Sequence, residues 1–294
     1  MNIVNPKFEI IEQEAGISGV YKMIEMAGRT CYQSGDRISA ASAKGFVERM
    51  IKSGHLSMLE HGAVYLTIER WRLSRHEYNA VQKYQDLANG TYVKVKTVDE
   101  YYSEDRTSTI DYVSTNLRVL VEHGWMDDLK YLSNPTKYHD RRVCVKFTSD
   151  IHFYKDVTRH RVMSWAIEST RFCNYLKKKK FGSSISFIKP CWLKPEEEED
   201  FKKDLELVES LYFKWLGKGW KPEEAAFFLI QGSKAEIVMS GFVSDFKHFF
   251  DLRSALHTTG RPHPTVEELV EPLRQEFIKR KYIVYNPNNK SNQL

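Results

Sequence analysis

Residues 143–171 read VCVKFTSDIHFYKDVTRHRVMSWAIESTR, and this stretch holds the densest structural and chemical signals in the chain. It opens on an alternating apolar pattern that predicts a half-buried strand: Val143, Val145 and Phe147. A helix is expected over residues 153–158, and the basic turn Arg159-His160-Arg161 follows it. Three such residues cannot all point into a core, because burying unpaired guanidinium groups costs too much free energy.

The basic turn therefore needs anionic partners. Planar guanidinium groups suit phosphate, and the hydroxyls of Ser169 and Thr170 with nearby backbone N–H groups would complete a cradle for a pyrophosphate and a monophosphate. The alternative is a surface cluster of ion pairs with Glu168 and Asp156. Spacing alone leaves both interpretations open.

Two further charged features lie outside this stretch. The run Lys177–Lys180 is typical of a solvated loop, and the alternative is an electrostatic funnel for an anionic substrate. On a helix expected over residues 245–256, His248 and Asp251 can share a face and Arg253 is offset from them. The sequence allows two interpretations of this group: a structural ion pair on the helix surface, or part of a functional site.

Composition limits the class of protein. The 294 residues are 41% hydrophobic and 28% charged, as in a globular chain that buries a sizeable core. The net charge of +5 suits an anionic ligand but falls short of the footprint of a nucleic-acid binder. No apolar run approaches the ~20 residues that span a bilayer, and the N-terminus lacks the pattern of a signal peptide. The four cysteines form no C-x-x-C pair, so a reduced cytoplasmic protein is expected.

The rest of the chain predicts helices interspersed with non-consecutive strands, which indicates an α+β domain. Helices are expected at residues 18–26, 42–54, 116–122, after Pro195, from Pro222, at 245–256, and from a T-x-x-E capping box at Thr265 and Glu268 to about 281. Further strands are expected at 64–68, 186–188 and 237–239. The polar stretch 85–140, with turns that include residues 105–108, is expected to be an insertion, and 286–294 a disordered tail.

Several common motifs are missing. The sequence has no G-x-G-x-x-G after a strand, no Walker A motif and no G-x-S-x-G elbow, so a dinucleotide would have to bind without the usual glycine-rich turn. His55 and His61 are six residues apart and do not share a helix face, so no metal site is predicted.

At this point the sequence resembles a known family. Arg159-His160-Arg161-x7-Ser169 matches the R-H-R-x7-S signature of the flavin-dependent thymidylate synthases, the ThyX family. Three other blocks resemble the family in order and spacing: AGRTCYQS (27–34), GHLSMLEH (54–61) and HFFDLR (248–253). The resemblance covers roughly residues 15–280, apart from the stretch near 85–140.

The resemblance implies a fold and a reaction. The fold is α+β, with a central, mostly antiparallel sheet flanked by helices, as a single domain over residues 1–285. The reaction is the reductive methylation of dUMP to dTMP, with 5,10-methylenetetrahydrofolate as carbon donor and FAD, reduced by NADPH, as hydride source. Members are homotetramers with active sites between subunits, and they bind FAD in an extended groove, which agrees with the missing glycine motif.

The resemblance also implies roles for single residues. Contacts to dUMP are expected from Asp156, Arg159, Glu168, Ser169, Thr170, Arg171 and Arg253. Contacts to FAD are expected from Ser57, Arg159, His160, Arg161 and His248. Because nothing marks Cys173 as an activated nucleophile, activation of the uracil ring is assigned to electrostatics, with Arg253 as the catalytic cation.

The sequence departs from the family pattern at several positions. Ala166, Ile167 and Phe172 replace an Asn, a Glu and a Tyr, Ala226 replaces an Arg, and Phe242 and Ser244 replace an Asn and an Arg near the flavin. Three hypotheses follow. The protein is an active thymidylate synthase, or it is a relative that acts on another pyrimidine nucleotide or only as a flavin NADPH oxidase. The third, a single-stranded nucleic-acid-binding module that uses the lysine run and the 16 tyrosines, is disfavoured by the low net charge.

Overall fold

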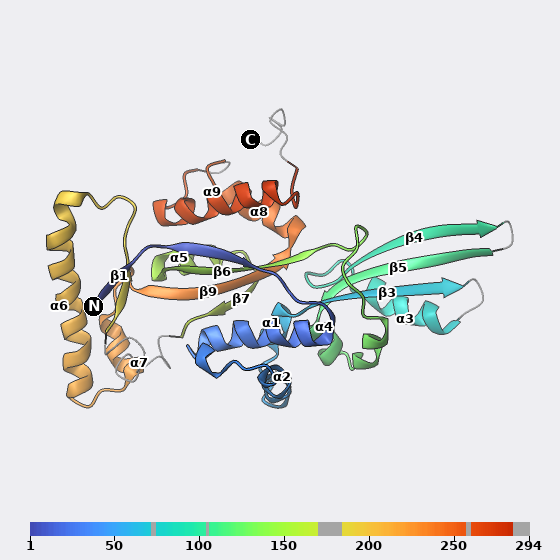
Figure 1. Ribbon diagram of the computed structural model, residues 1–294, viewed down its shortest axis with the longest axis horizontal. Coiled ribbons are helices and arrows are strands. Elements are labelled where there is room, and N and C mark those ends of the chain that lie inside the picture. Colours follow the sequence, from blue (N-terminus) through green and yellow to red (C-terminus); the bar gives the residue numbers. More distant parts are fainter. Residues whose placement is uncertain (72–74, 104–105, 170–183, 257–259, 285–294) are drawn as a thin grey trace.

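The centre of the molecule is a four-stranded antiparallel sheet in the order β2-β6-β9-β7 (Figure 1). Its strands are β2 (Lys7–Ile11), β6 (Arg142–Asp150), β9 (Lys234–Phe242) and β7 (Ser164–Ile167). Val145 and Phe147 of β6 belong to the hydrophobic core on one face, and Cys144 belongs to the core on the other face. The predicted central antiparallel sheet is confirmed, and its strand at 143–147 is β6.

The computed structural model describes residues 1–71, 75–103, 106–169, 184–256 and 260–284. The predictions for Thr170, Arg171, Lys177–Lys180 and the tail 286–294 lie outside the described residues.

Helices cover both faces of the central sheet. One face carries α5 (Ile151–Val157), α8 (Val243–Arg253) and α9 (Pro264–Lys279), which bury aromatic and branched side chains against it. The other face carries α1 (Gly16–Cys31), and α2 (Ser42–Lys52) packs on α1 (Figure 1). The predicted α+β class is therefore confirmed.

A second antiparallel sheet, in the order β3-β5-β4, extends from the central body (Figure 1, right). It consists of β3 (Ala63–Trp71), β4 (Lys94–Ser103) and β5 (Arg106–Asn116), and α3 (Arg75–Gln85) and α4 (Leu117–Glu122) accompany it. The predicted turn at residues 105–108 is wrong, because β5 already begins at Arg106. The polar sequence misleads because Thr107 and Ser108 pair with β4 along the ladder and Ser108 is fully buried in β5. Asp111 of the same strand is also fully buried, and it accepts a hydrogen bond from Thr97 Oγ1 at 2.6 Å.

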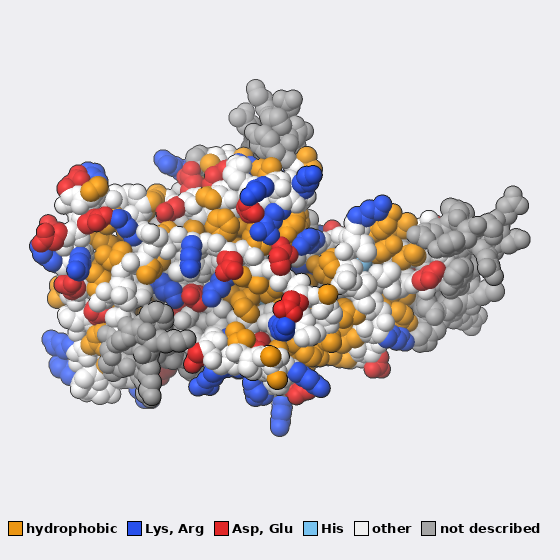
Figure 2. Space-filling view, viewed as in Figure 1, with side chains coloured by type: hydrophobic (Ala, Val, Ile, Leu, Met, Phe, Trp, Pro, Cys, Tyr) orange, Lys and Arg blue, Asp and Glu red, His pale blue; other side chains and the backbone are white. Residues whose placement is uncertain are grey.

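A third group of elements packs at the other end of the molecule. β1 (Asn2–Val4) pairs in parallel with the predicted strand β8 (Ser186–Ile188), and α6 (Glu198–Gly217) and α7 (Pro222–Ala225) share a small core with them. Acidic and basic side chains lie interspersed over this end (left in Figure 2), as in the ion pairs of Lys203 with Glu199 and Asp200 on α6. None of the described helices combines the length and apolar composition needed to cross a bilayer.

Two predicted helix ends have different outcomes. Gly54 follows α2 with φ +72°, so the predicted left-handed position after this helix is confirmed. The predicted capping box of Thr265 and Glu268 is wrong, because α9 begins at Pro264, two residues before the start that Thr265 as N-cap would give. Its N-cap is His263, whose Nδ1 accepts a hydrogen bond from the Thr265 backbone N–H at 3.4 Å. Proline at the first helical position has no N–H to satisfy, and this favours the earlier start.

The close contact between α1 and α2 gives a first prediction. A Cβ atom on Gly28 would lie 2.5 Å from Cζ of the buried Phe46 ring, so we expect Gly28→Ala to destabilise the fold. Overpacking of this kind costs about 1–3 kcal/mol, more than alanine gains in helix propensity. Thermal unfolding measures the effect, and Gly28→Ala should have a lower Tm than the wild type. Gly45→Ala on α2 is the matched control, because its Cβ would meet only Arg49 Nη1 at 3.6 Å, and an equal change in Tm for both variants would contradict the prediction.

Candidate active site

The basic turn Arg159-His160-Arg161 connects α5 to the edge strand β7. Asp150 starts α5 as a side-chain N-cap that accepts a hydrogen bond from the Phe153 backbone N–H at 2.7 Å. After α5 the backbone N–H of His160 donates to the Val157 carbonyl at 3.1 Å. The turn is therefore held by backbone bonds, and its side chains stand at the edge of the central sheet.

Three of the predicted site residues meet at this turn. Arg253, the last residue of α8, donates from Nη1 to Asp156 Oδ2 at 2.9 Å and from Nη2 to the Asp156 carbonyl at 3.1 Å. Its Nε donates to His160 Nε2 at 3.2 Å. The side chains of Arg253 and Asp156 are 16% and 14% exposed, so this charge pair is only partly screened by solvent. We call Asp156, His160 and Arg253 the Arg253 cluster.

The hydrogen bond from Arg253 fixes the protonation state of His160. A guanidinium group only donates, so Nε2 of His160 must carry a lone pair and the ring proton belongs on Nδ1. Burial lowers the pKa of His160, and the charges of Arg253 and His248 lower it further, to about 4, against the opposing effect of Asp156. His160 is therefore neutral at pH 7.

The remaining residues of the turn face solvent. The Arg159 side chain is 73% exposed and its Nη1 lies 3.5 Å from Asp156 Oδ1, while Arg161 is exposed. His248, on α8, is exposed, and its ring centroid lies 5.8 Å from that of His160. The predicted ion pair of the turn with Asp156 is confirmed for Arg159. Arg161 is exposed, so the other interpretation, a turn that binds an anionic ligand, stays open.

Glu168 and Ser169 lie in a second group, beyond the end of β7. Lys234 Nζ lies 3.0 Å from Glu168 Oε2, which also accepts the Glu236 backbone N–H at 3.0 Å. The Ser169 backbone N–H donates to the Cys31 carbonyl at the end of α1 at 2.9 Å. The interpretation of Glu168 as an ion-pair partner of the basic turn is therefore wrong, because Glu168 pairs with Lys234 of β9.

Three charged residues of this second group escaped the sequence analysis. Lys146 Nζ lies 2.9 Å from Glu236 Oε2, and Lys234 Nζ lies 3.4 Å from Glu236 Oε1. Burial acts to raise the pKa of Glu236, but Lys234 and Lys146 outweigh it and lower the pKa to about 2. Lys234 and Glu236 stand two positions apart on β9 and Lys146 lies on β6, so only the register of the two strands shows which charges pair.

Ser57, the other predicted FAD contact, lies in a short 3-10 helix over Leu56–His61 and is exposed. His55 is exposed and His61 is buried with Nδ1 2.8 Å from Ser240 Oγ. Among the described residues no group of His, Cys, Asp and Glu side chains is arranged to hold a metal ion.

The segment that carries the Arg253 cluster is similar to known proteins. Residues 142–277 match the family model Thy1, described as thymidylate synthase complementing protein. The resemblance to the flavin-dependent thymidylate synthases is confirmed over these residues. Flavin-dependent thymidylate synthases of Pyrococcus furiosus and Pyrococcus abyssi are each 29% identical over 126 residues, which is 42% of this chain and 49% of either relative. The match thus spans about half the length of these curated relatives.

Solved structures of a UMP/dUMP methylase, PolB from Streptomyces cacaoi, align over 95% of this chain at 13% identity. The structure bound with 5-Br dUMP gives a TM-score of 0.41 and is covered over 93% of its chain, and the one bound with 5-Br UMP gives 0.42 and 92%.

Proposed function

We propose that the protein is a flavin-dependent thymidylate synthase that methylates dUMP at C5 of the uracil ring. The match over residues 142–277 supports this reaction class. The observation that carries the proposal is the Arg253 guanidinium, which Asp156 and neutral His160 hold at a partly buried edge of the sheet. A fixed cation of this kind stabilises negative charge as it develops on a bound pyrimidine.

The cysteines support activation by charge rather than by a thiolate. Burial raises the pKa of Cys144 to about 12 and also raises the pKa of Cys31 and Cys191. A protonated thiol is a weak nucleophile, so these three residues are unsuited to attack the uracil ring. Cys173 lies outside the described residues. Arg253 has five N–H donors and uses three of them on Asp156 and His160, which leaves donors for a pyrimidine carbonyl.

The residues of the basic turn suit an anionic cofactor such as FAD. Arg159 and Arg161 are exposed, so both guanidinium groups can reach a pyrophosphate without first being buried as unpaired charges. Ser57 and His248 are also exposed and could add hydrogen bonds. When bound, reduced FAD would supply a hydride, with 5,10-methylenetetrahydrofolate as carbon donor and NADPH as reductant.

One departure from the family pattern has a structural substitute. The resemblance places an arginine of other members at Ser244. Here Lys94 of β4 donates from Nζ to Ser244 Oγ at 2.6 Å, and lies 4.9 Å from the centroid of the Phe242 ring. The second sheet therefore brings a cation to this position, which supports retention of an anionic cofactor.

The proposal further includes Glu168, Ser169, Thr170 and Arg171 as dUMP contacts, and a homotetramer with active sites between subunits. Cys31, Cys144 and Cys191 are unpaired, which supports a cytoplasmic location.

The test is release of tritium from 5-tritiated dUMP. Protein loaded with FAD and kept under reducing conditions is expected to release tritium, because methylation must remove the proton at C5. Parallel reactions with labelled UMP and dCMP compare other pyrimidine nucleotides. A flavin-loaded protein that releases no tritium from dUMP contradicts the proposal, and release from another nucleotide alone would favour a relative with altered chemistry, which Ile167 and Ala226 motivate.

A further inference from the structure

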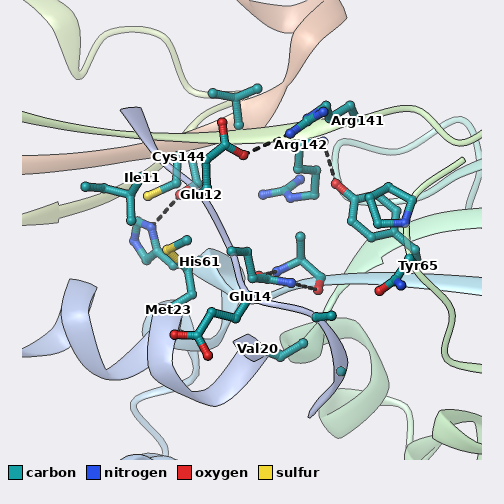
Figure 3. Close-up of a pocket in the computed structure, with 18 of the residues that line it drawn as sticks. Ile11, Glu12, Glu14, Val20, Met23, His61, Tyr65, Arg141, Arg142 and Cys144 are labelled. Atoms are coloured by element: carbon teal, nitrogen blue, oxygen red, sulfur yellow. Dashed lines mark hydrogen bonds and ion pairs between the residues drawn. The ribbon is translucent and has the colours of Figure 1, made fainter. Parts of the chain in front are cut away.

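A cavity of about 130 Å³ lies beside the N-terminal end of α1 (Figure 3). His61, Tyr65, Arg142, Cys144 and Ser240 line it, and residues 12–16 also border it. Cys144 belongs to the core on the α1 face of the central sheet, whereas His160 packs against Phe249 on the opposite face. The cavity shares no lining residue with the Arg253 cluster.

Arg142 is an unusual lining residue because its charge is buried. The residue is 8% exposed, and its side chain points into the cavity (Figure 3). Nη2 donates to the Glu60 carbonyl at 3.2 Å, and Cζ lies 4.8 Å from the centroid of the Phe242 ring. Within the described part of the chain Arg142 forms no ion pair. Burial lowers its pKa, but arginine stays protonated in proteins, so a costly unpaired charge remains.

The charged neighbours of Arg142 in this cavity are already engaged or neutral. Glu12 pairs with Arg141 at 2.9 Å and with Arg280 at 2.7 Å, and Glu14 pairs with Lys22 at 2.6 Å. Burial and the charge of Arg142 lower the pKa of His61 to about 3, so its ring is neutral at pH 7. Outside the cavity lining, the carboxylates of Glu60 and Asp245 also act on Arg142 and oppose the effect of burial on its pKa. Glu60 is paired with Arg118, and Asp245 accepts a hydrogen bond from the Phe242 backbone N–H at 3.3 Å, so neither forms an ion pair with Arg142.

Two further features favour an anion in this place. The Arg142 backbone N–H donates to the Tyr65 hydroxyl at 2.8 Å, and this leaves the hydroxyl proton available for another acceptor. The N-terminus of α1 has no side-chain cap at Ala15 and no acidic residue in its first turn. Its first N–H groups and the positive end of its dipole border the cavity at Gly16, whose Cβ position has no atom within 4 Å.

We propose that this cavity binds the oxyanion group of a small molecule, a carboxylate or a phosphate, with Arg142 as its counter-charge. The Tyr65 hydroxyl and the first N–H groups of α1 provide the other donors. Pockets for drug-sized ligands measure about 300–1,000 Å³, so the smaller cavity suits one oxyanion group rather than a whole nucleotide. This site is independent of the proposed thymidylate synthase reaction.

The test compares three proteins by thermal unfolding: the wild type, Arg142→Met and Arg261→Met. Each is titrated with inorganic phosphate or with glutarate, and sodium chloride keeps the ionic strength constant. We expect a saturable rise in the wild-type Tm with phosphate, glutarate or both, which identifies the oxyanion. Arg142→Met should need at least about tenfold more anion for the same rise, the effect of one charge-assisted hydrogen bond. Arg261→Met removes an arginine that does not line the cavity and is 75% exposed, so this variant should respond like the wild type.

Two results would overturn the proposal. One is a wild-type Tm that shows no saturable rise with either anion. The other is an equal rise in Arg142→Met, which would assign the effect to excluded anions or to another cationic site such as the basic turn. If Arg142→Met does not fold, calorimetric titration of Arg142→Lys replaces it. This variant keeps the charge but loses the planar fork, so its Kd should be about tenfold weaker, and unchanged affinity would equally overturn the proposal.

Discussion

Replacing Arg253 with alanine is expected to abolish tritium release from 5-tritiated dUMP while FAD remains bound. The guanidinium group is fixed by Asp156 at 2.9 Å and by His160 at 3.2 Å, so it is already oriented before a pyrimidine arrives. Removal of one preorganised donor of this kind costs about 10²–10³ in kcat. Arg159 and Arg161, the proposed cofactor contacts, stay in place, so the flavin absorption bands should persist.

His160 provides a second readout of the same variant. Burial is the largest cause of its low pKa, and the Arg253 charge is the next. Without Arg253 the pKa of His160 should rise from about 4 toward its ordinary value of 6.5, because Asp156 then acts with less opposition. An NMR titration of the ring resonances measures this shift.

Two matched variants separate chemistry from folding. Arg253→Lys keeps the charge but not the fork that bonds Asp156 and His160, so it should recover only part of the activity. Arg261→Ala removes an arginine that is 75% exposed and pairs with Glu267 at 3.4 Å, and its activity should be unchanged. Undiminished tritium release by Arg253→Ala would remove Arg253 from the catalytic role, and loss of flavin would point to a structural one.

The elements predicted correctly are those whose pattern is local. β6 alternates apolar side chains from Val143 to Phe147, and α7 begins at Pro222, where proline favours a first helical position. β4 and β5 pair with each other as neighbours in sequence, but they were missed because polar residues such as Asp111 interrupt the apolar alternation that predicts a strand. Asp111 is tolerated in the core of this sheet only because Thr97 and Arg70 bond to it. A polar residue paired in this way has no signature in a single sequence.

In the candidate active site, too, the features that are local in sequence were predicted and the pairing between strands was not. The motif that contains Asp156 and His160 is local, and the resemblance linked it to Arg253, so these three residues were predicted and the structure brings them together. Glu168 belongs to the same stretch of sequence, yet it pairs with Lys234 because β7 carries the chain away from the turn. The partner of a charge depends on strand register, and spacing along the chain does not encode it.

The charges paired across β6 and β9 are expected to stabilise the fold in a pH-dependent way. The pKa of Glu236 is about 2 in the folded protein, against an ordinary value of 4.5. A depressed carboxyl pKa contributes stability that is fully present above pH 4.5 and is lost as the pH falls through about 2. This lowering of the pKa corresponds to about 3 kcal/mol, and the Glu236 side chain is only 23% exposed, so solvent screening reduces this contribution little.

Glu236→Gln should therefore lower the free energy of unfolding by about 3 kcal/mol at pH 7, because Lys234 and Lys146 lose a buried partner. At pH 3 the wild type has already lost part of this contribution, so the difference between the two proteins should shrink. Urea unfolding at both pH values measures it. Glu199→Gln is the control, since Glu199 is 83% exposed in its pair with Lys203 and should change stability by less than about 1 kcal/mol. A difference between wild type and Glu236→Gln that is the same at pH 7 and pH 3 would show that the carboxylate charge is not what stabilises this part of the sheet.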